Sequence, residues 1–349
     1  MKQKTYAFSG KAVEYYFGES LGQLSRYADP ARTILIVDDQ VDRFHGARME
    51  GWRKIVVPGN ESSKDMREFQ RVIDELIRLE ADRKTLLVGV GGGVVTDLTG
   101  FVGSVYMRGI SYGFVPSTLL SQVDAALGGK NGVNFGNFKN MLGVIRQPEF
   151  LLFDYDLLKT LPEDQWRSGF AEVIKYGCIC DPVLFSYLEA NREGALAHEP
   201  SVIAHLVTRA AEIKSVIVGE DEFEKGQRRL LNFGHTVGHA VEKLEGIAHG
   251  QAVAKGMAVA CALSERLAGL PRKEVDRVVQ LIKGYHLPVE IESDTDQIAA
   301  YFRMDKKRER ESIHFILLEA IGRALVEPVP IERLHGLLTE VLDAARARH

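Results

Sequence analysis

The chain has 349 residues, 45% hydrophobic and 26% charged, which is typical of a soluble globular protein of about two domains. Lys and Arg number 44 against 48 Asp and Glu, and the formal net charge of −4 argues against a nucleic-acid partner. The three cysteines have no zinc-ribbon spacing, and the sequence shows neither an apolar leader nor a run of 18 apolar residues. We therefore expect a cytoplasmic enzyme without a membrane partner.

The first half of the chain alternates short apolar runs with helical patterns. Strands are predicted at 33–37, 54–57, 85–90, 112–115 and 150–153. A helix is predicted over 63–81, capped by Ser62 or Ser63, and another follows Gly91-Gly92-Gly93 as far as Tyr106. Strands that alternate with helices predict a mainly parallel sheet.

The pattern changes after about Leu158, where long amphipathic helices dominate. They are predicted over 163–177, 200–219, 235–245, 250–268, 272–284 and 331–346. Only 313–317 and 324–326 have the pattern of strands, and they predict a late hairpin. We predict an α/β domain over 1–158 and a mostly α-helical domain over 159–349.

Two glycine-rich segments could hold anionic groups. Gly91-Gly92-Gly93 stands between a strand and a helix, where backbone N–H groups can approach a phosphate, although a plain tight turn has the same pattern. Asp97 in the next helix could be a helix-dipole partner or a ligand contact. The segment 121–134 carries Lys130 and is followed by Lys139-Asn140, which indicates either an anion-binding loop or a solvated one.

The histidines and one glutamate form the second group of candidates. His235 and His239 are four residues apart, so on a helix they share a face and could chelate zinc. His249 begins the next predicted helix, and Glu172 stands three residues before Lys175. On the residues alone, a divalent metal site and an ordinary set of core histidines with a surface ion pair both remain open.

Several cations are concentrated near these motifs in a net-acidic chain. Together they would suit a small substrate that carries both phosphate and carboxylate groups. They are Arg108, Lys130, Lys139, Lys214, Arg228 and Arg229.

These segments together resemble the 3-dehydroquinate synthases of the sugar-phosphate cyclase superfamily. The matching motifs follow in order over nearly the whole chain, at 91–95, 106–109, 116–120, 124–130, 139–141, 171–177, 232–239, 249–250, 256–257 and 305–307. The resemblance implies a Rossmann-like nucleotide-binding α/β domain followed by a mostly helical metal-binding domain. It also implies NAD and Zn²⁺ as cofactors, with Co²⁺ as the alternative ion, and a homodimer.

The resemblance also implies roles for individual residues. Glu172, His235 and His249 match the zinc ligands, whereas spacing alone would have paired His235 with His239, which matches a substrate-side residue. The NAD contacts implied are Glu61, Lys64, Gly92, Gly93, Asp97, Thr118, Asp124, Lys130, Lys139 and Thr160. The substrate contacts implied are Lys130, Asn140 and Lys306 or Lys307 for the phosphate, Arg108 from the second subunit, and Lys175, Lys214, Arg228 and Asn232 for the carboxylate and hydroxyls.

The implied substrate is 3-deoxy-D-arabino-heptulosonate 7-phosphate. The implied reaction is transient oxidation by NAD, phosphate elimination, re-reduction and intramolecular aldol closure to 3-dehydroquinate, in the shikimate pathway to chorismate and the aromatic amino acids. The alternatives are another sugar-phosphate cyclase, such as an amino-dehydroquinate synthase, a metal-dependent alcohol dehydrogenase of the same architecture, and a silent binding protein. The choice among these alternatives rests on Lys175, Lys214, Arg228 and Asn232, which favour a carboxylated substrate.

The sequence departs from the family pattern at three positions. Thr96 replaces a usual glycine near the dinucleotide turn, where its Cβ could crowd the cofactor. Gln251 replaces a glutamate after His249-Gly, which removes a charge near the metal. Lys255 stands where the family prefers an apolar residue, and the connector from His239 to His249 is short.

Overall fold

The computed structural model describes residues 2–136, 138–306 and 312–346. They form two compact units, here called unit 1 and unit 2. Unit 1 comprises the chain up to Trp166 together with Ile203–Glu224, and unit 2 comprises Arg167–Val202 together with the chain from Lys225 onward. The single division predicted after residue 158 did not anticipate the return of 203–224. That segment belongs to unit 1 because its side chains bond there, as Ser215 does to Tyr15 at 3.0 Å.

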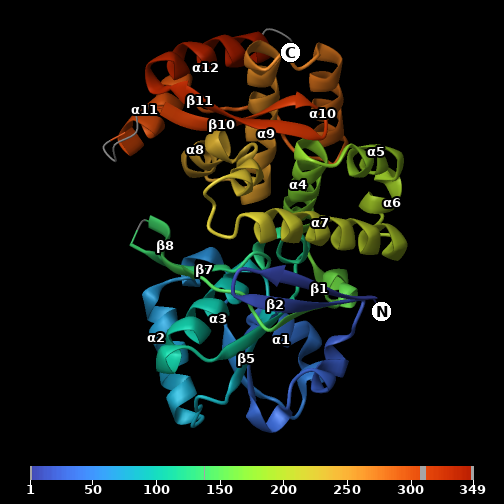
Figure 1. The fold of residues 1–349 in the computed structure, drawn as a ribbon, viewed down its shortest axis with the longest axis vertical. Coiled ribbons are helices and arrows are strands. Elements are labelled where there is room, and N and C mark those ends of the chain that lie inside the picture. The colour runs from blue at the N-terminus through green and yellow to red at the C-terminus, as the bar shows by residue number, and fades with distance from the viewer. Residues whose placement is uncertain (1, 137, 307–311, 347–349) are drawn as a thin grey trace. The chain divides into compact units, whose positions relative to one another are not determined.

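Unit 1 is built around one sheet (Figure 1). Its strands are β1 (Lys2–Phe8), β2 (Lys11–Phe17), β3 (Thr33–Asp38), β4 (Arg53–Val57), β5 (Leu86–Gly91), β6 (Ser111–Pro116) and β9 (Phe150–Phe153). Their order is β1-β2-β9-β6-β5-β3-β4, with β1 and β2 antiparallel and the remaining neighbours parallel. Five of these strands, β3, β4, β5, β6 and β9, were predicted. The pair β1–β2 was missed because β1 is largely exposed and mostly polar.

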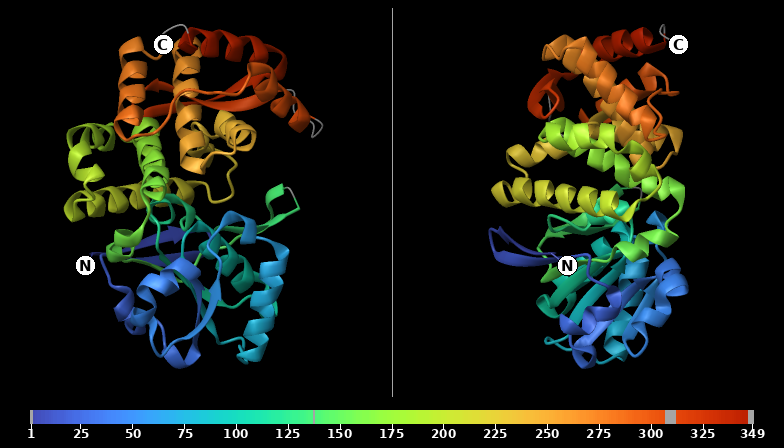
Figure 2. Two further views of the ribbon diagram at one scale, coloured as in Figure 1. Left: turned by 180° about the vertical axis from the view of Figure 1, so that it is seen from behind. Right: turned by 90° about the vertical axis from the view of Figure 1, so that its right-hand side faces the viewer.

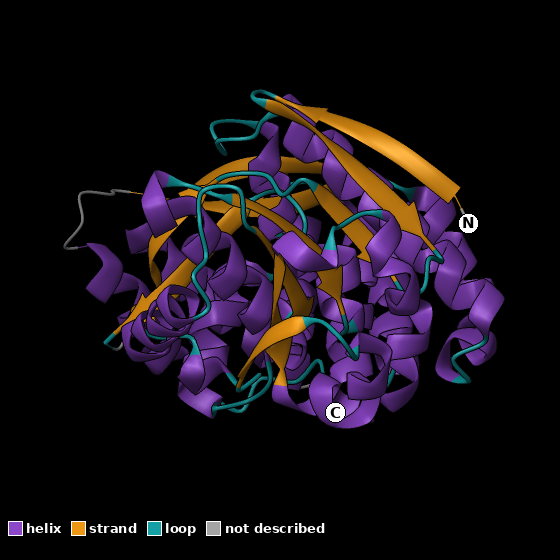
Figure 3. Ribbon diagram, turned by 90° about the horizontal axis from the view of Figure 1, so that it is seen from below, coloured by secondary structure: helices purple, strands orange, loops and turns teal. Residues whose placement is uncertain are grey.

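The central strands are buried on both faces. Every residue of β3 and of β9 is buried, which is typical of parallel strands covered by helices on both sides. Leu35, Val88, Val115 and Leu152 belong to one hydrophobic cluster on this sheet. Figure 3 shows the long strand pair that begins at the N label at the rim of the view.

The helices of unit 1 are α1 (Asp39–His45), α2 (Met66–Arg78), α3 (Gly93–Val105) and most of α7 (Pro200–Glu220). The helix predicted over 63–81 is shorter than expected at its start, and its cap is Asp65 rather than Ser62 or Ser63. The Asp65 carboxylate accepts from the N–H groups of Arg67 and Glu68, both at 2.9 Å. α1 was not predicted.

A second, antiparallel hairpin belongs to unit 1. It consists of β7 (Lys130–Phe135) and β8 (Phe138–Ile145), in the segment that the sequence suggested was a loop. Figure 2 shows it extending away from the main sheet. β8 begins with four exposed residues, then alternates half-buried with exposed ones and has no fully buried position, so its sequence carries no strong strand signal.

Unit 2 is mostly helical, as predicted. Its helices are α4 (Glu163–Ile179, from Arg167), α5 (Pro182–Ala190), α6 (Arg192–Leu196), α8 (His235–Glu245), α9 (His249–Leu267), α10 (Arg272–Gly284), α11 (Thr295–Lys306) and α12 (Ile331–Arg346). The predicted late hairpin is present as β10 (Ser312–Ala320) and β11 (Arg323–Pro330). α5, α6 and α11 were missed. Within the described parts of the chain, no helix is both long and apolar enough to cross a bilayer.

Candidate functional site

Three helices of unit 2 bring one carboxylate and two imidazoles together. Glu172 lies in the middle of α4, and His235 and His249 are the first residues of α8 and α9. The Nε2 atoms of His235 and His249 each lie 3.5 Å from Glu172 Oε1. Their ligand atoms all lie within 4.8 Å of one another, and no other His, Cys, Asp or Glu group of the described residues forms such a cluster.

Each imidazole presents the same ring nitrogen to Glu172. His235 Nδ1 lies 3.1 Å from the carbonyl oxygen of Phe233. A carbonyl can only accept, so Nδ1 carries the proton and Nε2 is left for a ligand. His249 Nδ1 lies 3.1 Å from Glu242 Oε2, which fixes that ring in the same way. The two histidine rings are therefore held with their Nε2 atoms directed at the same oxygen, Glu172 Oε1.

The electrostatics of this cluster suit a cation. Glu172 is fully buried, and the Lys175 ammonium contacts its Oε2. Burial alone would raise the pKa of Glu172, but Lys175 and the two imidazoles hold it well below its usual range. Glu172 Oε1 has no hydrogen-bond partner among the described residues, and it lies 3.5 Å from both imidazole nitrogens. A buried carboxylate oxygen beside two imidazole nitrogens fits a divalent metal ion.

His249 lies between two carboxylates, those of Glu172 and Glu242. Burial would lower its pKa, but the contacts with the Glu172 and Glu242 carboxylates raise it to about 10. Two carboxylates therefore face this imidazole, one at each ring nitrogen. A divalent cation at Nε2 would displace a proton from that nitrogen.

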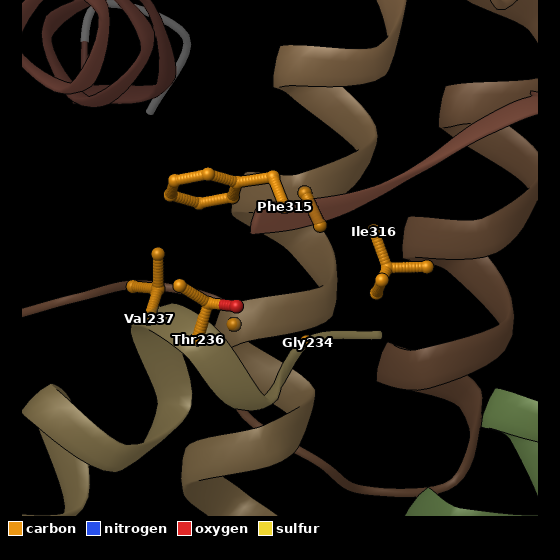
Figure 4. Close-up of a pocket in the computed structure, with 7 residues that line it drawn as sticks. Gly234, Thr236, Val237, Phe315 and Ile316 are labelled. Carbon is orange, nitrogen blue, oxygen red and sulfur yellow. The ribbon is translucent and has the colours of Figure 1, made fainter. Parts of the chain in front are cut away.

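Glycines let these helices approach one another closely. A Cβ on Gly250 would lie 2.3 Å from the Cα of Ser168, so α9 meets α4 without side chains between them. A Cβ on Gly256 would lie 1.9 Å from the carbonyl oxygen of Gly234, which immediately precedes His235 on α8. Figure 4 shows Thr236 and Val237 at the start of α8 facing Phe315 and Ile316, with Gly234 beside them. The small depression there has no room for a water molecule.

The remaining unit 2 candidates are distributed as follows. Arg228 and Asn232 belong to a 3-10 turn (η8, Gln227–Asn232) just before α8, and Arg228 is buried. His239 lies one turn beyond His235 and is exposed, with its ring centroid 5.5 Å from that of His235. Lys306 is the last residue of α11, and its side chain lies outside the described part, as does Lys307 entirely.

In unit 1, the Gly91–Gly93 turn lies where the order of the sheet reverses. After β3 the chain adds β4 on one side, and it adds β5 and β6 on the other. In open parallel sheets, ligands bind at the carboxyl ends of the strands at such a point. A Cβ on Gly91 would lie 3.0 Å from Asp38 Cβ, so the ends of β3 and β5 meet there. A Cβ on Gly92 would lie 3.1 Å from the Thr118 methyl carbon, so this pair is adjacent as well.

Three of the NAD and substrate candidates are in contact beside this turn. The buried Lys64 ammonium contacts the Asp97 carboxylate and donates to Asn140 Oδ1 at 2.6 Å. Burial raises the pKa of Asp97, an effect that Lys64 opposes. Glu61 lies in the preceding 3-10 turn (η4, Glu61–Ser63).

Two further lysines of unit 1 are paired with acids. Lys214 Nζ lies 3.0 Å from Asp124 Oδ1 and donates to the Asp124 carbonyl oxygen at 2.8 Å. Lys130, at the start of β7, contacts Glu224, which the sequence analysis did not single out.

The remaining candidates of unit 1 are Lys139, Arg108 and Thr160. Lys139 is exposed on β8, and Arg108 is exposed on a 3-10 turn (η5, Tyr106–Arg108) with φ +68°. Thr160 Oγ1 lies 2.8 Å from His45 Nε2.

Comparison with known proteins identifies the family. The 3-dehydroquinate synthase N-terminal domain matches residues 54–168, and the C-terminal domain of the same family matches 169–308. A 3-dehydroquinate synthase of Teredinibacter turnerae is 43% identical over 277 residues, which are 78% of this chain and 77% of that protein. The chain belongs to the 3-dehydroquinate synthase family. The resemblance inferred from the motifs is therefore confirmed.

Solved structures of related sugar-phosphate cyclases have the same fold. A 2-deoxy-scyllo-inosose synthase complexed with carbaglucose-6-phosphate, NAD⁺ and Co²⁺ is 26% identical, with a TM-score of 0.87 over 97% of this chain and 99% of that one. A 2-epi-5-epi-valiolone synthase of Streptomyces hygroscopicus, with NAD⁺ and Zn²⁺ bound, is also 26% identical, with a TM-score of 0.87 over 98% and 99%. The predicted fold class of this synthase-family chain is thus confirmed.

Two departures from the synthase family pattern are absorbed locally. Thr96 is buried within α3, and its hydroxyl donates to the carbonyl oxygen of Gly93 at 3.1 Å. Gln251 removes one carboxylate near the cluster, but Glu242 supplies another to His249 from α8. Glu242 follows His235 by two helical turns, and that i+7 spacing was the signal in the sequence that could have found it.

The third departure, Lys255, forms a buried ion pair. Its ammonium lies 2.6 Å from Glu245 Oε2, and the two side chains are 5% and 7% exposed. Glu245 Oε1 also accepts from the backbone N–H groups of Glu292 and Ser293 and from the Ser293 hydroxyl, each at 2.9 Å. Lys255 is six residues along α9 from His249, about 9 Å at 1.5 Å per residue. Its charge is thus compensated away from the metal cluster.

We expect Glu245→Ala to lower the free energy of unfolding by about 3–5 kcal/mol, because it leaves Lys255 buried without a counter-ion. Lys255→Met should cost less, since Glu245 keeps three donors. Burial would raise the pKa of Glu245, but Lys255 and Ser293 lower it below 4.5. The stability it contributes is therefore present above pH 4.5 and lost as the pH falls through the folded-state pKa. Urea unfolding of both variants at several pH values measures this, and equal losses would contradict it.

Proposed function

We propose that this chain is a working 3-dehydroquinate synthase that converts 3-deoxy-D-arabino-heptulosonate 7-phosphate into 3-dehydroquinate and phosphate. Membership of the family supports the reaction, and one observation on this chain carries the proposal. The buried Glu172 carboxylate lies close to the Nε2 atoms of His235 and His249, and the Nδ1 atom of each ring is held by an acceptor. A silent binding protein would have no need to bury such a costly set of groups.

The residues present in each unit fit the implied cofactors. Glu172, His235 and His249 would hold a Zn²⁺ or Co²⁺ ion, and the Gly91–Gly93 turn with Asp97 and Thr118 would contact NAD. When bound, the metal lowers the pKa of a coordinated hydroxyl, and NAD accepts and returns a hydride. The related solved cyclases with NAD⁺ and either metal support this assignment.

The cationic residues would bind and orient the substrate. In unit 1, Lys130 and Asn140 would hold the phosphate, where Glu224 and Lys64 contact them now. In unit 2, Arg228, Asn232 and Lys175 would hold the carboxylate and hydroxyls. A buried guanidinium can bind a carboxylate through two parallel hydrogen bonds, which favours a carboxylated substrate over a neutral sugar phosphate.

His239 would act on the substrate side of the site. It is exposed and lies one helical turn beyond His235, so it can exchange a proton with a substrate group without holding the metal.

Besides Gly92 and Gly93 of the glycine turn, Asp97 and Thr118, the NAD contacts that we propose are Glu61, Lys64, Asp124, Lys130, Lys139 and Thr160. Lys214 is proposed for the substrate, together with Lys306 or Lys307.

One assay separates this function from its alternatives. The protein is incubated with Zn²⁺, the heptulosonate phosphate and NAD well below the substrate concentration, and phosphate and dehydroquinate are measured. We expect both products in equal amounts, beyond the amount of NAD, with no accumulation of NADH. Stoichiometric NADH would indicate a dehydrogenase. Turnover only of an amino-sugar analogue or a neutral sugar phosphate would indicate another cyclase.

We also propose a homodimer in which Arg108 reaches the substrate phosphate of the second subunit. The exposed position of Arg108 on η5 supports this, because its guanidinium is available to a neighbouring chain. Light scattering on the same sample gives the mass in solution, and a monomeric mass would refute the proposal.

A further inference from the structure

One side chain, Asn134, joins the β7–β8 hairpin to the η4 turn of unit 1. Its Nδ2 donates to Glu61 Oε1 at 2.8 Å, and its Oδ1 accepts from the backbone N–H of Asn140 at 2.8 Å. Its own backbone N–H donates to the carbonyl oxygen of Lys64 at 2.7 Å. Three residues that we propose as ligand contacts therefore all bond to Asn134. Neither the family resemblance nor the comparisons give Asn134 a role.

The hairpin register explains why an asparagine stands here. Val133 pairs with Leu142, but Phe135 pairs with Phe138, so the register shifts around Asn134. Asn140 lies in the extra segment of β8 with φ +53°, a left-handed conformation that asparagine tolerates better than most residues. The bulge takes the Asn140 N–H out of the regular ladder. The Asn134 side chain supplies the acceptor that the ladder no longer provides.

Lys64 closes the connection from the other side. Its ammonium donates to Asn140 Oδ1 at 2.6 Å, and the backbone of Lys64 is bonded to Asn134. Glu61, Lys64, Asn134 and Asn140 thus form one continuous hydrogen-bonded group, with Lys64 buried. Because Asn134 contacts both segments, a shift of the η4 turn must be transmitted to Asn140.

We propose that Asn134 is a positioning residue that couples NAD binding to binding of the substrate phosphate. This rests on the proposed function, in which Glu61 and Lys64 contact NAD and Asn140 contacts the phosphate. NAD at the η4 turn fixes Glu61 and Lys64, and Asn134 then holds Asn140 in its binding conformation. By linkage, the substrate strengthens NAD binding by the same factor.

The first test compares Asn134→Ala with Phe135→Ala, a matched control on the neighbouring residue, which is 57% exposed. In the natural protein, we expect NAD to slow hydrogen–deuterium exchange in the segment 130–145. Asn134→Ala should lose that protection, weaken NAD about tenfold in calorimetry and raise KM for the heptulosonate phosphate about tenfold, as expected for one hydrogen bond to a charged group. Bound zinc should not change. Phe135→Ala should behave as the natural protein does.

The second test separates the two contacts of Asn134. In Asn134→Asp, one oxygen still accepts from Asn140, but the other faces the Glu61 carboxylate without a donor. We expect about tenfold weaker NAD binding from this change in the natural background. In a Glu61→Gln background the glutamine amide can donate to the new carboxylate, so the same change should cost less than twofold.

Different results would refute the coupling proposal and the proposed function. An equal cost of Asn134→Asp in both backgrounds would overturn the proposal, as would unchanged NAD affinity and exchange in Asn134→Ala. If Asn134→Ala does not fold, the Asn134→Asp cycle decides. NAD affinity and exchange require no turnover, so a protein that shows the coupling but forms no dehydroquinate refutes the proposed function alone. Absence of NAD binding by the natural protein would refute both.

Discussion

His235→Ala is expected to lose bound zinc and synthase activity together. His235 provides one of the two imidazole nitrogens that lie 3.5 Å from the buried Glu172 carboxylate. Without it, a metal ion would keep one imidazole and one carboxylate, and we expect its affinity to fall at least a hundredfold, beyond the loss typical of an outer-shell change. Metal content after dialysis, measured beside the rate of phosphate release, tests this.

His239→Ala is the matched control on the same helix. His239 lies one turn further along α8 and is not in the group of ligand atoms within 4.8 Å. We expect this variant to retain zinc at the natural stoichiometry while its rate of phosphate release falls, because the residue acts on the substrate. Loss of zinc from His239→Ala, or its retention in His235→Ala, would overturn the ligand assignment. Circular dichroism of both variants shows whether they are folded.

Gly256→Ala is expected to be the most damaging single methyl group that can be added near the metal cluster. The new Cβ would lie 1.9 Å from the Gly234 carbonyl oxygen and 2.8 Å from the Gly238 nitrogen, both of which are backbone atoms that no rotamer change can move. α8 must therefore shift away from α9, and His235 shifts with it. We expect a loss of about 3 kcal/mol or more in the free energy of unfolding, at the upper end of overpacking costs, together with weaker zinc binding.

Gly336→Ala provides the control for this change. Gly336 lies within α12 and is exposed, and a Cβ there would have no heavy atom within 4 Å. Alanine favours a helix over glycine by about 0.5–1 kcal/mol, so this variant should be as stable as the natural protein or slightly more so, with zinc binding unchanged. Thermal unfolding and metal content of the two variants decide between a local clash and a general effect of added methyl groups. Similar stability and zinc content in both would contradict the packing argument.

Local sequence was sufficient for most of the secondary structure. The strands β3, β5 and β9 are continuous apolar runs because they are buried on both faces, and such runs stand out in any sequence. The long helices of unit 2 were found with nearly their final bounds, because one face of each is apolar at helical spacing. Strands with little burial, such as β1 and β8, have no such pattern and were missed.

The family motifs, too, could be recognised in the sequence alone, since they are short stretches in a fixed order. They identified Glu172, His235 and His249 as candidate ligands, where helical spacing by itself favoured His235 with His239. Spacing describes only one helix. It says nothing about a carboxylate that comes from a helix 63 residues earlier in the chain, as Glu172 does relative to His235.

Tertiary structure decided which side chains meet. Glu242 orients His249, Glu245 compensates Lys255, and Asn134 supports Asn140, and each pair joins separate elements. These contacts depend on how closely helices and hairpins approach, which is set at positions such as Gly250 and Gly256 where two backbones touch. A sequence records the identity of each residue and its local period, but the distance between two backbones depends on all the side chains packed around them.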